Sequence, residues 1–206
     1  EFFGNPEVAA VRRKLADTLW KAIQARFWDP QTRYFSDDSE HKYPSQHVNS
    51  LVVLSGRLPA AEAHELIGRA WKDKSLARCT VYFRYYLDRA LSAAGWGDLY
   101  LERLGTWEGM LAEGLSTWAE TDIPDTRSDC HAWGASPNIE FFRNVLGVDS
   151  AGPGFSKVRI RPHLGPLQSA RGVVPHPKGL IQVEVKREGG VVKHKVTLPP
   201  GVTEVA

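Results

Sequence analysis

The chain of 206 residues is 42% hydrophobic and 24% charged, which suffices for one good core or two modest ones and argues against disorder. No stretch approaches 18 uninterrupted apolar residues, so neither a membrane span nor a membrane partner is expected. Residues 1–150 carry 17 Lys and Arg against 21 Asp and Glu, whereas residues 151–206 carry 9 against 3. A composition shift this abrupt indicates a change of architecture.

The first part of the chain is patterned for helices. In residues 6–28, apolar side chains recur at steps of three and four residues, which places them on one helical face. Five further helices are expected, and residues such as Ser45, Pro59 and Gly147 mark where some of them begin or end. The expected helices are residues 45–56, 59–73, 81–95, 98–114 and 136–147. Six helices joined by short turns predict stacked helical hairpins.

After Gly147 the apolar period changes to two. "KVRIRP", "LIQVEVKRE" and "VVKHKVTLP" alternate apolar and polar residues, as half-buried strands do. The sequence therefore predicts an α+β protein in two parts, with helical hairpins over residues 1–150 and a small antiparallel β domain over residues 151–206. The basic residues of the second part alternate along the strand, which is typical of a solvated sheet face. Since no aromatic residues are interleaved with them, nucleic-acid binding is kept only as the third hypothesis.

The two cysteines, Cys79 and Cys130, are too few for a disulfide framework, although they could pair. Burial as small hydrophobic residues is the expected state of both. No His, Cys or carboxylate cluster has the spacing of a zinc site, and no Gly-rich phosphate loop is present. No metal and no cofactor are therefore expected.

The stretch "DTRSDCHAWGASP", residues 125–137, carries unusually dense polar chemistry, and Glu120 stands just before it. Glu120 follows a helix stop and precedes Pro124, so it is expected on a loop. A carboxylate there can accept a proton from water if a second carboxylic acid lies opposite. The alternative is an ordinary surface glutamate near a turn. Arg127 and Asp129 are expected to hold the loop through an ion pair or backbone hydrogen bonds.

His131 is best interpreted as a hydrogen-bond donor to a polar ligand, with a packed loop histidine as the alternative of comparable weight. Its sequence neighbours cannot converge on one metal ion, and adjacency gives poor geometry for a Cys-His or Ser-His pair. Trp133 and Trp118 could form an aromatic wall, which suits the apolar face of a sugar ring. The alternative is that both tryptophans are core residues.

Several of these stretches resemble a known family. "GLSTWAETDIPDTRSDCHAWGASPNIEFFRNVLGVDSAGPGFSKVRIRPHLG" resembles the C-terminal part of bacterial α-L-rhamnosidases of glycoside hydrolase family 78. "YPSQHVNSLVVLSG" and "TVYFRYYLDRALSAAG" resemble upstream segments of that family, and "GVVPHPKGLIQVEVKREGG" is similar to its closing β-sandwich. The resemblance covers residues from about 40 to 206.

The resemblance implies an (α/α)6 barrel of helical hairpins, present here in part, followed by a β-sandwich. It implies inverting cleavage of terminal α-L-rhamnosides by two carboxylic acids, with a rhamnose-containing glycoside or oligosaccharide as the ligand. The family carries its general base in a Thr-x-x-Glu stretch, which matches residues 117–120 and makes Glu120 the expected base. His131 would then contact rhamnose hydroxyls, with Trp133 and Trp118 shaping the pocket.

The sequence also departs from the family pattern. The family's general acid lies in an Asp-Glu-Arg string, and no such string occurs in these 206 residues. We therefore expect a fragment or truncated form with incomplete catalytic machinery. Six helices make half of a six-hairpin barrel, whose open apolar face could be covered by self-association. The alternative function is a non-catalytic carbohydrate-binding or assembly unit.

Overall fold

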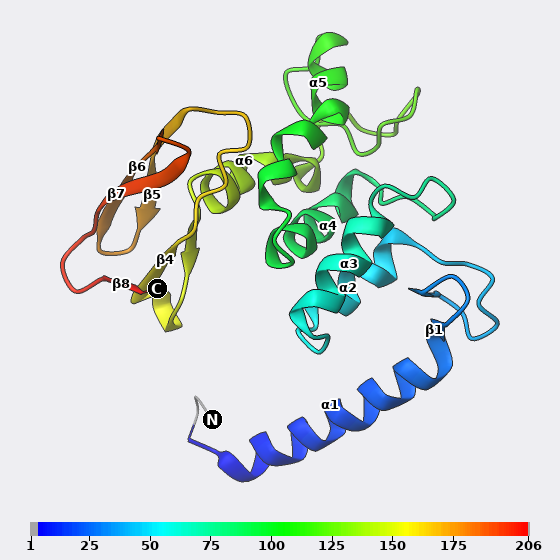
Figure 1. Cartoon of the computed structure of the whole chain (residues 1–206). Coiled ribbons are helices and arrows are strands. Elements are labelled where there is room, and N and C mark those ends of the chain that lie inside the picture. Colours follow the sequence, from blue (N-terminus) through cyan, green and yellow to red (C-terminus); the bar gives the residue numbers. More distant parts are fainter. Residues whose placement is uncertain (1–3, 206) are drawn as a thin grey trace. The chain divides into compact units, whose positions relative to one another are not determined.

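The computed structural model describes residues 4–205. The chain divides into two compact units, residues 1–79 and residues 80–206. Figure 1 shows the helices and strands of the chain, coloured along the sequence. Among the described residues, no helix combines the length and the hydropathy that crossing a membrane requires. The domain boundary predicted at residue 150 stays a prediction, although the change from helices to strands does occur at that point of the chain.

The first unit consists of three helices and a short hairpin. Its elements are α1 (Pro6–Phe27), β1 (Trp28–Asp29), β2 (Tyr34–Phe35), α2 (Gln46–Leu54) and α3 (Ala60–Ala70). The Ser45 side chain caps α2 by accepting a hydrogen bond from the N–H of Val48 at 3.2 Å, as predicted. The core of this unit gathers apolar side chains of β2, α2 and α3 with two from the segment that follows. They are Tyr34, Phe35, Val52, Val53, Ala63, Leu66, Ile67, Ala70, Leu76 and Cys79.

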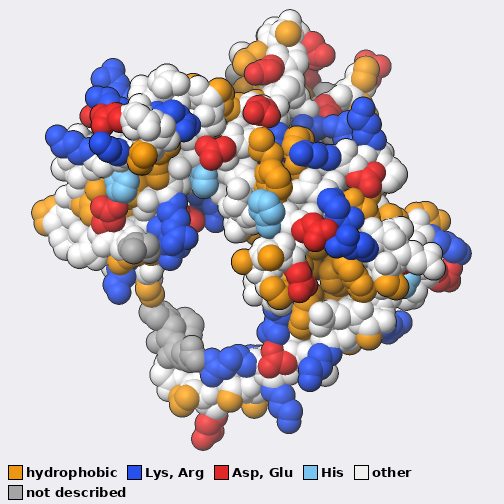
Figure 2. Space-filling model, in the orientation of Figure 1, with side chains coloured by type: hydrophobic (Ala, Val, Ile, Leu, Met, Phe, Trp, Pro, Cys, Tyr) orange, Lys and Arg blue, Asp and Glu red, His pale blue; other side chains and the backbone are white. Residues whose placement is uncertain are grey.

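Helix α1 has the predicted apolar row, but the described residues of its own unit do not bury it. No residue of α1 is buried, and the large side chains of the row are between 36% and 67% exposed. They are Val8, Val11, Leu15, Leu19 and Ile23. Figure 2 shows hydrophobic and basic side chains next to one another along this helix. An apolar row of this length on a surface helix is typical of a contact face.

The helices of the second unit are shorter than the sequence predicts. They are α4 (Val81–Ala93), α5 (Gly105–Ala112) and α6 (Ser136–Glu140), the last continued by a π-helical turn at Phe141–Val145. The helix expected at 98–114 begins only at Gly105, because two 3₁₀ turns, Gly97–Leu99 and Leu101–Arg103, precede it. Asp98 does not cap a helix, since its carboxylate accepts the N–H of Gly165 at 2.9 Å.

Two three-stranded sheets complete the second unit. Their strands are β3 (Val148–Ser150), β4 (Lys157–Ile160), β5 (Ser169–His176), β6 (Gly179–Glu188), β7 (Val191–Thr197) and β8 (Thr203–Val205). Strands β5, β6 and β7 form an antiparallel meander, and β3 pairs antiparallel with β4. Strand β4 pairs with β8 in parallel, so the prediction that all strands are antiparallel is wrong for this pair. The meander between them serves as the crossover that a parallel pair needs.

Within the described residues, six helices in the first part and two sheets in the second confirm the α+β fold class, and the two sheets share one hydrophobic core. Alternate residues of β6 point into this core, and Ile181 and Val185 are fully buried. Val158 of β4 and Leu164 meet them from the other sheet and its following loop. This is the period-two pattern that the sequence predicts for half-buried strands.

Gly147 connects the helical part to β3 in a conformation that excludes a side chain. Its φ is +75°, in the left-handed region that favours glycine. A Cβ atom at this position would lie 2.1 Å from the carbonyl carbon of Arg161 and 2.3 Å from its oxygen. The N–H of Arg161 in turn donates to the Gly147 carbonyl at 2.9 Å, so the two backbones are held together.

We predict that Gly147→Ala destabilises the protein far more than Gly154→Ala. Gly154 is a matched control, because its φ is also positive, at +62°, but an added Cβ would meet nothing within 4 Å. The control should lose about 1–2 kcal/mol from the left-handed backbone alone. Gly147→Ala should lose about 4 kcal/mol or more, because a backbone must also move. Urea unfolding measures both, and equal losses would contradict the close approach of the two backbones.

Glu140 of α6 is a buried acid without a hydrogen bond. Its side chain is 1% exposed, neither carboxylate oxygen has a hydrogen-bond partner, and Arg143 Nη1 lies 3.6 Å from Oε1. Burial raises the pKa of Glu140 to about 7, and the nearby guanidinium groups of Arg89 and Arg143 only partly oppose this shift. The carboxylates of Asp88 on α4 and Asp149 on β3 raise the pKa further.

This pKa predicts that Glu140 makes stability depend on pH between about 4.5 and 7. A carboxyl whose pKa is higher in the folded state stabilises most at low pH, and its contribution is lost as the pH rises through the folded value. The shift from 4.5 to about 7 corresponds to about 3 kcal/mol. Glu140→Gln should therefore gain unfolding free energy relative to the wild type as the pH rises from 5 to 8.

Urea unfolding of both proteins across this pH range tests the prediction. Glu108→Gln is the control, because Glu108 is an exposed residue of α5 and its replacement should leave the pH profile unchanged. Parallel profiles for Glu140→Gln and the wild type would show that the buried carboxyl has no such effect.

Candidate functional site

Two irregular segments of the second unit pair with each other and bring the predicted residues together. The N–H of Glu120 donates to the Ser128 carbonyl at 2.8 Å, and the N–H of His131 donates to the Trp118 carbonyl at the same distance. The Thr117 hydroxyl also donates to the Asp129 carbonyl. These bonds align residues 117–120 with residues 128–131, so that Glu120 and His131 share one small site.

Glu120 is paired with a guanidinium and lies close to an imidazole. Arg127 donates to both carboxylate oxygens, from Nη2 to Oε1 at 2.5 Å and from Nε to Oε2 at 3.0 Å. His131 Nε2 lies 4.0 Å from Oε1. Glu120 is mostly shielded, whereas the Arg127 side chain is 74% exposed and covers the carboxylate from the solvent side. The interaction expected of Arg127 with the loop is thus a two-point contact with Glu120.

The histidine is held between the carboxylate and an aromatic surface. The ring centroids of His131 and Trp133 are 4.2 Å apart, and those of Trp133 and Tyr82 of α4 are 5.3 Å apart. His131 Nδ1 is buried and has no hydrogen-bond partner. Trp133 is 42% exposed, so part of its ring remains open to solvent. The resulting patch combines an open aromatic face with an imidazole N–H and a carboxylate, which suits a hydroxylated ring.

The other predicted tryptophan lies on the inner side of the same segments. Trp118 is partly buried and packs against a cluster of core residues. These residues are Val81, Trp107, Met110 and Ala119. Its ring therefore supports the segment that carries Glu120. Tyr82, which does reach Trp133, was not identified from the sequence, where it reads as one more aromatic residue of a helix.

Gly134 fixes the segments against the core. Its carbonyl accepts a hydrogen bond from the buried Trp107 indole at 2.7 Å. A Cβ on Gly134 would lie 2.9 Å from the Ala119 carbonyl oxygen and 2.9 Å from Trp118 Cβ. Only a glycine allows this approach, so residue 134 sets how closely the His131–Trp133 segment lies to the Glu120 segment.

The loop between Glu120 and Ser128 is tied to the neighbouring helices near its start. The Asp122 carboxylate accepts hydrogen bonds from Arg84 of α4 at 3.0 Å and from Thr106 of α5 at 3.4 Å. Asp125 has a φ of +58°, which is uncommon for a residue with a side chain. The loop between Glu120 and Ser128 is therefore anchored at its base and on one flank.

The cysteines form no disulfide bond with each other. Both cysteines are free thiols, and Cys79 is buried as expected. The same expectation is wrong for Cys130, which is exposed because its segment lies at the surface of the loop pair. Within residues 4–205, no group of three or more His, Cys, Asp or Glu side chains is placed to hold a metal ion.

Comparisons with known proteins match this architecture. Residues 147–205 match the family model of the bacterial alpha-L-rhamnosidase C-terminal domain. Among curated proteins, none matches the sequence significantly. A GH78 family rhamnosidase of Bacillus sp. GL1 is 26% identical and superimposes with a TM-score of 0.77, over 92% of this chain and 23% of that one.

Two further solved structures share the fold. The Streptomyces avermitilis alpha-L-rhamnosidase complexed with L-rhamnose is 19% identical with a TM-score of 0.72, over 95% of this chain and 20% of that one. The Klebsiella oxytoca rhamnosidase with rhamnose bound is 24% identical with a TM-score of 0.60, over 69% and 30%. This chain thus spans between 20% and 30% of the length of these relatives. The chain is related to the α-L-rhamnosidases of glycoside hydrolase family 78 and carries their C-terminal domain at residues 147–205.

Proposed function

We propose that this chain supplies the general-base side of an inverting α-L-rhamnosidase site, with Glu120 as the base. The observation that carries the proposal is the approach of Glu120 to His131, 4.0 Å between Oε1 and Nε2, next to the open ring of Trp133. The rhamnose bound in two related structures supports a rhamnose-containing glycoside as the ligand.

In the proposed reaction, each group has a separate task. Inverting hydrolysis needs a carboxylate that takes a proton from water as the water attacks the anomeric carbon, and an acid that protonates the departing oxygen. Glu120 takes that proton. His131 donates a hydrogen bond from Nε2 to a sugar hydroxyl, and Trp133 packs against the C–H face of the ring. Trp118 shapes the pocket from the inner side, by supporting the backbone of Glu120.

Arg127 has to share the carboxylate with the attacking water. Its two N–H donors occupy both oxygens of Glu120, and its side chain is exposed enough to move. We propose that the water replaces one of these donors, so that the remaining one keeps the carboxylate oriented. A bidentate arginine fixes the plane of a carboxylate, which a lysine cannot do.

The general acid, in this proposal, comes from outside these 206 residues, since the sequence lacks the family's Asp-Glu-Arg string. The isolated chain would then have incomplete activity. The uncovered apolar row of α1 supports a contact with further protein surface, for which a second copy of this chain is one candidate.

We predict that the chain hydrolyses α-L-rhamnosyl fluoride but not methyl α-L-rhamnoside. Fluoride departs without a proton, so cleavage of its C–F bond needs only the base, whereas methoxide departure needs the acid. The product should be β-L-rhamnose, observed by NMR before it mutarotates. Glu120→Gln should slow fluoride release about 10²–10⁴-fold, which is the usual contribution of a general base.

Two controls make this test specific. Glu113→Gln changes an exposed glutamate beyond α5 and should leave the rate unchanged. Azide should restore turnover to Glu120→Ala and give the β-L-rhamnosyl azide, because the anion attacks without a base. An unchanged rate in Glu120→Gln would exclude Glu120 as the base, and cleavage of the methyl glycoside by the wild type would place an acid within the chain. Rhamnose binding without fluoride release would favour the non-catalytic carbohydrate-binding unit.

A further inference from the structure

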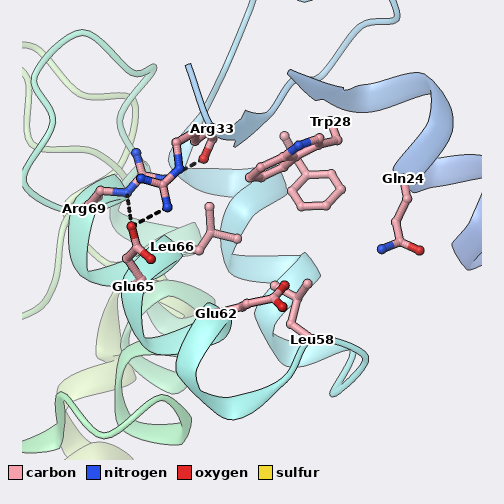
Figure 3. Close-up of a pocket in the computed structure, with 9 residues that line it drawn as sticks. Gln24, Trp28, Arg33, Leu58, Glu62, Glu65, Leu66 and Arg69 are labelled. Carbon is pink, nitrogen blue, oxygen red and sulfur yellow. Dashed lines mark hydrogen bonds and ion pairs between the residues drawn. The ribbon is translucent and has the colours of Figure 1, made fainter. Parts of the chain in front are cut away.

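The first unit contains a hollow that the proposed catalytic site does not use. It lies between the C-terminal half of α1, the β1–β2 hairpin and α3, with a volume of about 320 Å³ (Figure 3). Sites for small molecules typically span about 300–1,000 Å³, so the hollow is large enough for a compact ligand. Its wall combines apolar side chains, of which Trp28 and Phe35 are aromatic, with polar and charged ones.

The aromatic wall is rigid. Trp28 and Phe35 are direct cross-strand partners in the hairpin, with ring centroids 5.0 Å apart. Phe35 is almost fully buried, and its N–H donates to the Asn49 side chain at 3.0 Å. Trp28 therefore rests on a fixed ring and is itself only partly buried, so it can meet a ligand without rearrangement.

Three charged groups of the lining contact one another. Arg33 Nη2 lies 2.6 Å from Glu65 Oε1, and Arg69 Nε lies 3.8 Å from the same oxygen. Arg69 also donates to the Arg33 carbonyl at 2.6 Å and lies over the Tyr34 ring at 4.6 Å. Figure 3 shows this triad on one side of the hollow. These contacts hold the hairpin to α3.

Two polar side chains remain available. Within the described residues, neither Glu62 of α3 nor Gln24 of α1 has a hydrogen-bond or ion-pair partner in the protein, and both line the hollow together with Trp28 (Figure 3). They offer two carboxylate oxygens and one amide, which can accept from hydroxyl groups and donate to them. The two arginines and two glutamates of the lining cancel in formal charge, so a neutral ligand is favoured over an ion.

We propose that this hollow is a saccharide-binding subsite. Trp28 packs against one C–H face of a sugar ring, while Glu62 and Gln24 bind its hydroxyls. An indole face with a few polar groups around it is the arrangement that an amphipathic ring needs. The subsite does not depend on the function proposed for Glu120, because none of its residues belongs to that site.

Titration with L-rhamnose and D-glucose, followed by NMR of ¹⁵N-labelled protein, tests the proposal. At least one sugar should shift the Trp28 indole resonance and the backbone amides of Leu58 and Glu62 in a saturable manner. Glu62→Gln should weaken this binding about tenfold or more, as expected for a hydrogen bond to a charged acceptor. Trp28→Leu should abolish it. Unchanged spectral dispersion shows that each variant is folded.

Matched variants separate the possible outcomes. Glu7→Gln, at the far end of α1, should show the same Trp28 shift as the wild type, and so should Glu113→Gln, an exposed glutamate beyond α5. The proposal is overturned if neither sugar shifts the Trp28 indole resonance, or if the saturable shift of the Leu58 amide survives unchanged in Glu62→Gln or in Trp28→Leu. A tighter saturable response to choline than to either sugar would also overturn it, because the hollow would then be a cation site.

Discussion

The candidate site depends on one buried hydrogen bond, from the Trp107 indole to the Gly134 carbonyl. The segments that carry Glu120 and His131 pair with each other through three hydrogen bonds, and a 3₁₀ turn at Ala132–Ala135 follows His131. Gly134 lies in this turn, and its missing side chain lets the backbone lie against Ala119 and Trp118. An indole N–H buried without a partner would be costly, so the core itself favours this arrangement. The distance between carboxylate and imidazole follows from the packing beneath them.

Features of the fold that have local causes could be predicted from the sequence. Ser45 starts α2 and Gly147 ends the helical part because a cap and a left-handed glycine act within a few residues. The late start of α5 could not be predicted, since Asp98 bonds to Gly165, far away in the sequence. The parallel pairing of β4 with β8 also depends on a distant segment. An alternation of apolar and polar residues predicts a strand, but it does not predict which other strand pairs with it.

In the candidate site, too, features with local causes could be predicted, whereas contacts with distant residues could not. Glu120, His131 and Trp133 stand in a recognisable sequence stretch, and the structure places them together. The contact of Arg127 with Glu120 depends on how residues 117–120 pair with residues 128–131, which no spacing reveals. Tyr82 reaches the site from α4 and carries no local signal at all. Side chains that enter a site from another element are therefore the part that sequence patterns miss.

The parallel strand pair also constrains how the protein is made. Strand β4 has β3 on one side and β8 on the other, and β8 lies at residues 203–205. A ribosome therefore completes the whole β5–β7 meander before the second neighbour of β4 exists. Until then β4 presents an open edge, which is a template for pairing with other chains. During synthesis, this edge of β4 is therefore open to pairing with other chains until β8 docks on it.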